Sequence, residues 1–270
     1  MPYKKVLLIA TEIYPYLPST EMSITARNLQ MGILNSGKEI RTFMPRFGCV
    51  SERRNQLHEV IRLSGLNIII NGADHHLIIK VASVHSNHIQ IYFIDNEEFF
   101  KRKYVMVDAK GDGFADNEER SIFYVRGVLE TIKKLRWVPD IVHCHGSITA
   151  LAPLYVKKHF KGDPCYKNSK VIYSLYNDDF RRPYSEEFVN KAKIDGVTFN
   201  DLNSVKEKPD HVAVNKLAID FSDGVIAGSN EVNPELVEYA SQKEKLLFLP
   251  YQPGQDDIDT FDAFYNTLLQ

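Results

Sequence analysis

Polar and aromatic side chains directly follow four apolar, β-prone runs of this sequence, where a ligand site is expected. In open α/β sheets the ligand crevice lies beyond the carboxyl ends of the strands. Carboxylate, hydroxyl, amide and imidazole groups there can hydrogen-bond a polar ligand. The candidate binding residues are Glu12 and Tyr14 after residues 5–10, His145 and Ser147 after 139–145, Tyr176 and Asn177 after 170–175, and Ser229 after 223–229.

Other kinds of site chemistry have no motif in this chain. The first loop, TEIYPYLPSTEM, contains no glycine, and the Walker pattern GxxxxGK[ST] does not occur, which disfavours a phosphate cradle. Cys49, Cys144 and Cys165 are widely spaced and form no CxxC or Cys/His pattern. We therefore expect no metal, no cofactor and no disulfide framework, and the residues identify no confident catalytic group.

Two of the polar groups have a structural alternative. His143 and His145 lie two positions apart, and on the simpler interpretation His143 faces the sheet packing while only His145 reaches the crevice. The run DNEER precedes a long helical pattern, so Asp116 can serve as an N-cap. The structural role is the better explanation for this acidic run.

The elements that position these residues alternate between strands and helices. Residues 5–10 predict a buried strand, residues 22–33 a helix closed by Gly37, and 38–45 a second strand. Short strand-like runs between 57 and 94 predict an antiparallel excursion, and 119–136 a long helix. Strands at 139–145, 170–175 and 223–229 complete a Rossmann-like, doubly wound α/β fold with a mostly parallel sheet.

A single domain over residues 1–270 is expected. Asp256 to Leu269 has helical spacing, so residues 256–270 should form a terminal helix packed on the domain. No internal repeat, low-complexity tract or linker interrupts the chain.

Composition disfavours two classes of partner. The 33 basic and 35 acidic residues give a net charge of -2, which provides no field that attracts nucleic acid or an anionic membrane. No run approaches the ~20 apolar residues of a membrane-spanning helix, and the N-terminal apolar run is too short for a signal peptide. We expect a cytoplasmic protein without a nucleic-acid or membrane partner.

Ordered landmarks resemble the N-terminal domain of bacterial glycogen synthases and plant starch synthases, which are retaining glucosyltransferases with the GT-B fold. WVPDIVHCHGSITALAPLYVK resembles the family's W-x-P-D-x-x-H-x-H-D-W-H-T segment, and KVLLIATEIYP its opening strand and Ser-Glu-x-Tyr/Phe-Pro. GILNSGKEIRTFMPRFG, IYFIDNEEFFKR and GDGFADNEERSIFYVRGVLE also match in order. The resemblance covers about residues 3 to 251 and carries over Glu12, His145 and Asn177 as site residues, and also Asp116 and Arg120.

Departures from the family pattern affect its donor site. The family's Lys-Thr-Gly-Gly-Leu, whose lysine and glycines approach the sugar nucleotide, here reads PSTEM over residues 18–22. His-Asp-Trp-His reads His145, Gly146, Ser147 and Ile148. The chain ends soon after LLFLPY, where the family enters its nucleotide-binding C-terminal domain, so the resemblance implies a single N-terminal half.

Three functions follow from this resemblance. The first is the family's chemistry, glucose transfer from ADP-glucose to an α-1,4-glucan, with no activity expected from this chain alone because the stabilising groups are lost. The second is a noncatalytic module that binds α-glucan or maltooligosaccharide, or that regulates or scaffolds glycogen metabolism; aromatic residues could stack on sugar faces there, or simply be buried. The third is a subunit that forms a homodimer or binds a partner GT-B C-terminal domain.

Overall fold

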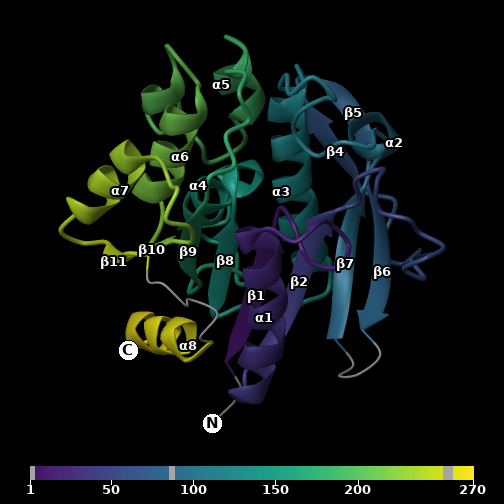
Figure 1. The fold of residues 1–270 in the computed structure, drawn as a ribbon. Helices are drawn as coiled ribbons and strands as arrows, with labels where there is room; N and C mark the ends of the chain where they lie inside the picture. Colours follow the sequence, from purple (N-terminus) through teal and green to yellow (C-terminus); the bar gives the residue numbers. More distant parts are fainter. Residues whose placement is uncertain (1–3, 85–88, 252–257) are drawn as a thin grey trace.

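A computed structural model describes residues 4–84, 89–251 and 258–270, and its centre is one large β-sheet (Figure 1). Within the described residues this sheet has nine strands in the order β11-β10-β9-β8-β1-β2-β7-β6-β3. The seven strands from β11 to β7 are mutually parallel. Their bounds are β1 Lys5–Ala10, β2 Glu39–Pro45, β7 Ile89–Asp95, β8 Ile141–His145, β9 Lys170–Leu175, β10 Gly224–Ala227 and β11 Leu247–Leu249.

The central strand β1 is apolar because helices cover both faces of the sheet. Every residue from Val6 to Ala10 is buried, as expected of a parallel strand without a solvent face. Helices α1 and α8 lie on one face, and α3 and α4 lie behind the sheet (Figure 1). The helices are α1 Glu21–Asn35, α2 Glu97–Phe100, α3 Asn117–Lys134, α4 Leu151–Lys157, α5 Phe188–Ala192, α6 His211–Asp220, α7 Pro234–Ser241 and α8 Ile258–Leu268, with short 3-10 turns η1 Ser147–Thr149 and η2 Asn203–Val205.

The predicted antiparallel excursion divides into two parts. β7 pairs in parallel with β2 and so extends the main sheet, and β6 (Ile78–Val84) and β3 (His58–Glu59) continue it in antiparallel pairing. β4 (Asn67–Ile70) and β5 (Ala73–His76) form a separate two-stranded sheet. The sequence pattern predicted the strands but not the parallel pairing of β7, since pairing partners are not encoded in local periodicity.

The mostly parallel α/β architecture is confirmed, with small differences at the strand ends. β8 begins at Ile141 and β10 ends at Ala227, inside their predicted bounds. β11 was not predicted, because Leu247–Leu249 is only three residues long. Within the described residues, no helix is both long enough and apolar enough to cross a membrane.

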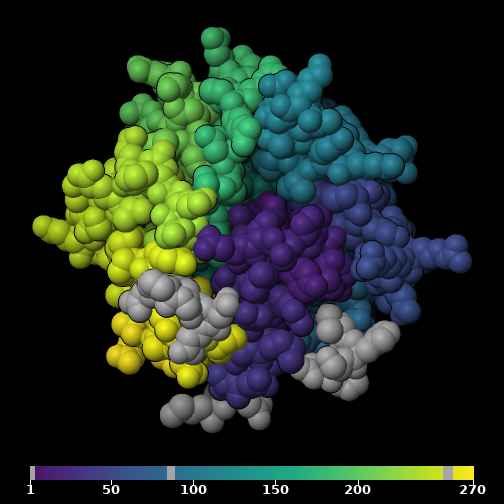
Figure 2. Space-filling view, in the orientation of Figure 1, coloured from purple at the N-terminus to yellow at the C-terminus, as the bar shows by residue number. Residues whose placement is uncertain are grey.

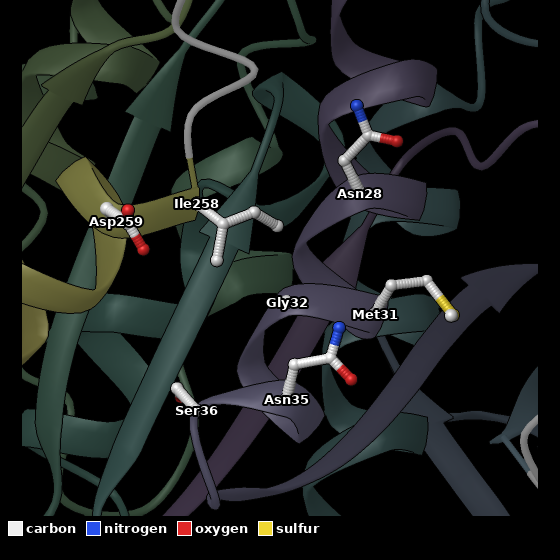
Figure 3. A pocket seen from close by; sticks show the side chains of 7 residues that line it. All are labelled: Asn28, Met31, Gly32, Asn35, Ser36, Ile258 and Asp259. Atoms are coloured by element: carbon white, nitrogen blue, oxygen red, sulfur yellow. The ribbon is translucent and has the colours of Figure 1, made fainter.

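The C-terminal helix α8 packs against α1 and the sheet. Its predicted start at Asp256 lies outside the described residues. Phe261, Phe264 and Tyr265 are buried, and Lys38 forms an ion pair of 2.6 Å with Asp262. Figure 3 shows Ile258 pointing toward Gly32 of α1, where it occupies the space that a Cβ atom would need. The close approach of the two helices therefore depends on a glycine in the last turn of α1.

We predict that Gly32→Ala destabilises the protein, although alanine is a better helix former by about 1 kcal/mol. The new methyl group would overlap the Ile258 side chain and displace α8, and such overpacking costs about 1–3 kcal/mol. Urea unfolding measures the change. Gly162→Ala is the control, because nothing lies within 4 Å of the methyl group that it adds. Unchanged or increased stability of Gly32→Ala would show that α8 does not pack as described.

Candidate functional site

A pocket lies at the carboxyl ends of the parallel strands and contains four of the predicted site residues. It encloses about 230 Å³. In Figure 2, purple atoms from the N-terminal part of the chain lie next to yellow-green atoms from the part after β10. The lining residues are Glu12, Thr20, Glu21, Met22, Tyr176, Asn177, Asp178, Ser229 and Glu231.

The strand order explains the position of this pocket. From β1 the chain passes to β2 on one side, and it later returns to β8 on the other side of β1. The loops after β1 and β8 therefore diverge, and a crevice opens between them. The N-terminus of α1 reaches the same place, and Thr20 caps it by accepting a hydrogen bond of 3.1 Å from the Ser23 amide.

Besides Asp178, which directly follows the candidate Asn177, four lining residues were not predicted from the sequence: Thr20, Glu21, Met22 and Glu231. A signal for the first three was present, since they occupy the segment in which the sequence departs from the family's Lys-Thr-Gly-Gly-Leu pattern. Glu231 had no such signal. It enters the site through the Asn177 side-chain amide, which donates a hydrogen bond of 3.0 Å to its carboxylate.

Glu12 is a half-buried carboxylate on the pocket wall. Burial raises its pKa, and the nearby Asp178 carboxylate adds to that effect. The Thr20 hydroxyl opposes the rise by donating a hydrogen bond of 2.7 Å to Glu12 Oε2. The carboxylate is thus held in one orientation at the end of β1.

Asp178 is fixed by Ser147, which lies beneath it. The Ser147 amide donates to Asp178 Oδ2 at 2.5 Å, and its hydroxyl donates to Oδ1 at 2.8 Å. Burial raises the pKa of Asp178, while the nearby His211 and the bonds from Ser147 oppose the rise. Ser147 is 1% exposed and gives its proton to a carboxylate, so it orients Asp178 and is not arranged as a nucleophile.

Gly146 allows the backbone to pass close under the pocket. Its φ is +84°, a conformation that favours glycine. A Cβ atom would lie 2.6 Å from the Thr11 hydroxyl and 2.7 Å from both Asp178 Oδ2 and Met22 Cε. The space that a larger residue would fill is taken by Asp178 and Met22.

His145 lies below the pocket and not on its wall. His143 and His145 are both 0% exposed, and their ring centroids are 4.2 Å apart, so both point to the same face of the sheet. We expected His143 to face the sheet packing and only His145 to reach the crevice. Residues two apart on a strand share a face, so His145 is buried on the same face as His143 and does not reach the crevice. His143 Nδ1 lies 2.5 Å from the Tyr265 hydroxyl of α8, and Tyr176 bonds His145 Nδ1 at 3.2 Å.

The remaining predicted residues lie away from this pocket. Tyr14 is 37% exposed, and the Arg27 guanidinium lies 5.3 Å from the centroid of its ring. Asp116 occupies the N-cap position of α3 without a side-chain capping bond, because both of its oxygens pair with Arg102. The capping prediction for its side chain is therefore wrong, since the ion pair takes the carboxylate away from the helix.

Arg120 is a buried cation in an aromatic cage. Its guanidinium lies within 5.5 Å of the ring centroids of Phe47, Phe100 and Phe114. Its Nε donates a hydrogen bond of 2.9 Å to the Phe99 carbonyl. Burial, with the nearby Arg102 charge, lowers its pKa to about 10. Arg120 thereby connects α3 to the loop that precedes it.

The electrostatic character of the pocket is acidic. Four carboxylates line it, from Glu12, Glu21, Asp178 and Glu231, and none of its described lining residues is basic. Within the described part of the chain, no group of three or more His, Cys, Asp or Glu side chains could hold a metal ion. The pocket therefore suits neutral hydroxyl groups, which carboxylates and amides bind as hydrogen-bond acceptors and donors.

Comparison with known families identifies the family of this chain. The family model described as the starch synthase catalytic domain matches residues 5–247. The chain belongs to the starch synthase catalytic domain family. The resemblance to glycogen and starch synthases that the sequence motifs indicated is thereby confirmed.

Curated relatives of this starch synthase family chain are glycogen synthases. It is 33% identical over 174 residues to those of Chlorobium luteolum and Chlorobaculum tepidum. Each alignment covers 64% of this chain and 36% of the relative. The chain thus spans about a third of the length of the curated relatives it matches.

Solved structures agree on the fold. The catalytic domain of starch synthase IV from Arabidopsis thaliana, bound to ADP and acarbose, has a TM-score of 0.71 at 18% identity and covers 92% of this chain and 51% of that one. A sucrose-phosphate synthase from Thermosynechococcus elongatus has a TM-score of 0.51 at 11% identity, covering 99% and 100%. The starch synthase family chain therefore has a Rossmann-like fold that matches about half of a GT-B starch synthase catalytic domain, as predicted.

We predict that the buried histidines make this starch synthase family domain sensitive to acid. Burial lowers the pKa of His145 from 6.5 to about 3, so between these values the unfolded chain binds more protons than the folded one. Stability is then lost as the pH falls below 6.5, by about 2 kcal/mol for one such histidine between pH 7 and pH 5.

His145→Gln tests this sign, because a glutamine amide can bond the Tyr176 hydroxyl but does not titrate. Urea unfolding at pH 7, 6 and 5 should show the stability difference between wild type and variant shifting by about 2 kcal/mol in favour of the variant. His58→Gln, at an exposed histidine, is the control. A difference that stays constant with pH would refute the prediction.

Proposed function

We propose that this chain is a glucan-binding domain of the glycogen and starch synthase family that does not transfer glucose by itself. The observation that carries the proposal is the lining of the pocket, with four carboxylates and no basic residue among the described ones. This lining suits an uncharged sugar better than a nucleotide diphosphate.

Charge decides between these two ligands. Two like unit charges about 4 Å apart near a protein surface repel by about 4 kcal/mol. A diphosphate in this pocket would meet several carboxylates and no compensating cation. Where the family pattern has a lysine and two glycines, this chain has Pro18, Thr20 and Glu21. These replacements remove the preorganised stabilisation that a leaving diphosphate requires.

Hydrogen bonding supports a saccharide ligand. Glu12 and Asp178 are held in place by Thr20 and Ser147, and Asn177 is held by Glu231. Oriented acceptors and one amide donor match the hydroxyl groups of a glucose unit without further ordering of the side chains.

Aromatic stacking contributes little in this pocket. Tyr176, Phe180 and Tyr184 are 4%, 1% and 6% exposed, and Phe180 stacks on Tyr184 with centroids 4.5 Å apart. Burial was the alternative explanation for these rings. The pocket therefore relies on polar groups for sugar recognition.

Maltohexaose titration by calorimetry tests the binding proposal. Wild type should bind, and Asn177→Ala should bind about fivefold more weakly, the effect of losing about one neutral hydrogen bond. Asn266→Ala, an exposed asparagine on α8, is the matched control and should bind like wild type. Absence of heat with wild type at millimolar maltohexaose would overturn the proposal.

The catalytic part of the proposal has a separate test. Purified chain supplied with labelled ADP-glucose and glycogen should incorporate no glucose, because the pocket lacks a cation for the diphosphate. An authentic glycogen synthase in the same assay serves as the positive control. Clear incorporation by this chain would contradict the expected inactivity without affecting the binding proposal.

A further inference from the structure

Phe199 is an exposed aromatic ring on a projecting part of the fold. It is 54% exposed, in the segment between α5 and α6 that forms the upper edge of the molecule (Figures 1 and 2). Exposing so large an apolar side chain forgoes the free energy of its burial, about 1.5–3 kcal/mol. Such a ring is a candidate binding surface if the loop around it holds it in contact with solvent.

The loop around Phe199 is anchored on both sides. Val197 and Leu202 are 3% and 0% exposed, so the chain enters and leaves the core next to the ring. Thr198 donates two hydrogen bonds to Asp201, at 2.7 and 2.9 Å, and Asp201 pairs with Lys158 at 2.6 Å. The ring is therefore presented to solvent by an ordered turn.

Two hollows flank the ring, and one side of the ring is already occupied. The first hollow, about 530 Å³, is lined by Lys193 and Phe199, and the Lys193 ammonium lies 4.0 Å from the ring centroid. The second hollow, about 470 Å³, is lined by Phe199 but not by Lys193. The ring thus remains available to a ligand from the second hollow.

The second hollow combines this ring with neutral polar groups. Its other lining residues are Glu186, Val189, Asn190, Asn200, Asn203 and Lys206. Three amides supply both donors and acceptors, and one carboxylate is balanced by one ammonium, so the lining has no net charge. A phosphate or a metal ion would find no matching charge, whereas a sugar ring offers an apolar face and a rim of hydroxyls.

We propose that Phe199 and this second hollow form a surface site for a neutral saccharide chain. A sugar ring stacks on Phe199 while its hydroxyls bond the amides of Asn200 and Asn203. The site shares no lining residue with the pocket at the carboxyl ends of the strands. The ligand class is the one proposed for that pocket, so the inference extends the proposed function, and separate variants test the two sites.

A fluorescent variant gives a local readout. The chain has one tryptophan, Trp137, which is 4% exposed and lies outside the lining of the hollow. In Phe199→Trp the introduced indole should change its emission when maltohexaose is added, while wild-type emission stays constant. Cellohexaose in a parallel titration distinguishes α-linked from β-linked chains. No emission change with either sugar would overturn the proposal.

Retardation in a native gel containing glycogen measures the contribution of the ring. Phe199→Ala should bind about fivefold more weakly than wild type, the worth of about one aromatic contact. Tyr104→Ala is the matched control, since Tyr104 is 46% exposed elsewhere on the surface. Asn177→Ala, measured alone and combined with Phe199→Ala, separates the two sites. If only Asn177→Ala weakens glycogen binding, the surface site is refuted. If only Phe199→Ala weakens it, the surface site is supported and the pocket is refuted.

Discussion

The parallel pairing of β1 with both β2 and β8 is the constraint on which the rest of this structure depends. Five registered pairs join β1 to each neighbour, and the chain reverses its direction of travel across the sheet at this strand. That reversal opens the crevice and brings the ends of β1, β8, β9 and β10 to one edge. Because every side chain from Val6 to Ala10 is buried, hydrophobic burial holds this arrangement in place.

A layer of polar contacts beneath the crevice sets its chemistry. Gly146 lets the backbone pass under Asp178, Ser147 orients that carboxylate, and Thr20 orients Glu12. The carboxylates are thus fixed by short-range bonds that cost little reorganisation when a ligand binds. These contacts hold two of the carboxylates that give the pocket its acidic lining.

The C-terminal helix is coupled to this layer through the histidines. Tyr265 of α8 bonds His143, and His143 lies against His145, which bonds Tyr176 on the pocket wall. These groups are buried, so their hydrogen bonds must all be satisfied within the protein. A polar network therefore links the back of the pocket to a helix that is distant in sequence.

The sequence by itself determined the alternation of strands and helices, the family and the edge of the sheet where the site lies, because hydrophobic period and loop position are local properties. It also supplied Glu12, Tyr176, Asn177 and Ser229, which meet in one pocket. Only the tertiary structure decided that His145 is sealed beneath that pocket, that Asp116 pairs with Arg102, and that Glu231 joins the site. Strand pairing and side-chain burial depend on contacts between distant segments, and no local pattern encodes those contacts.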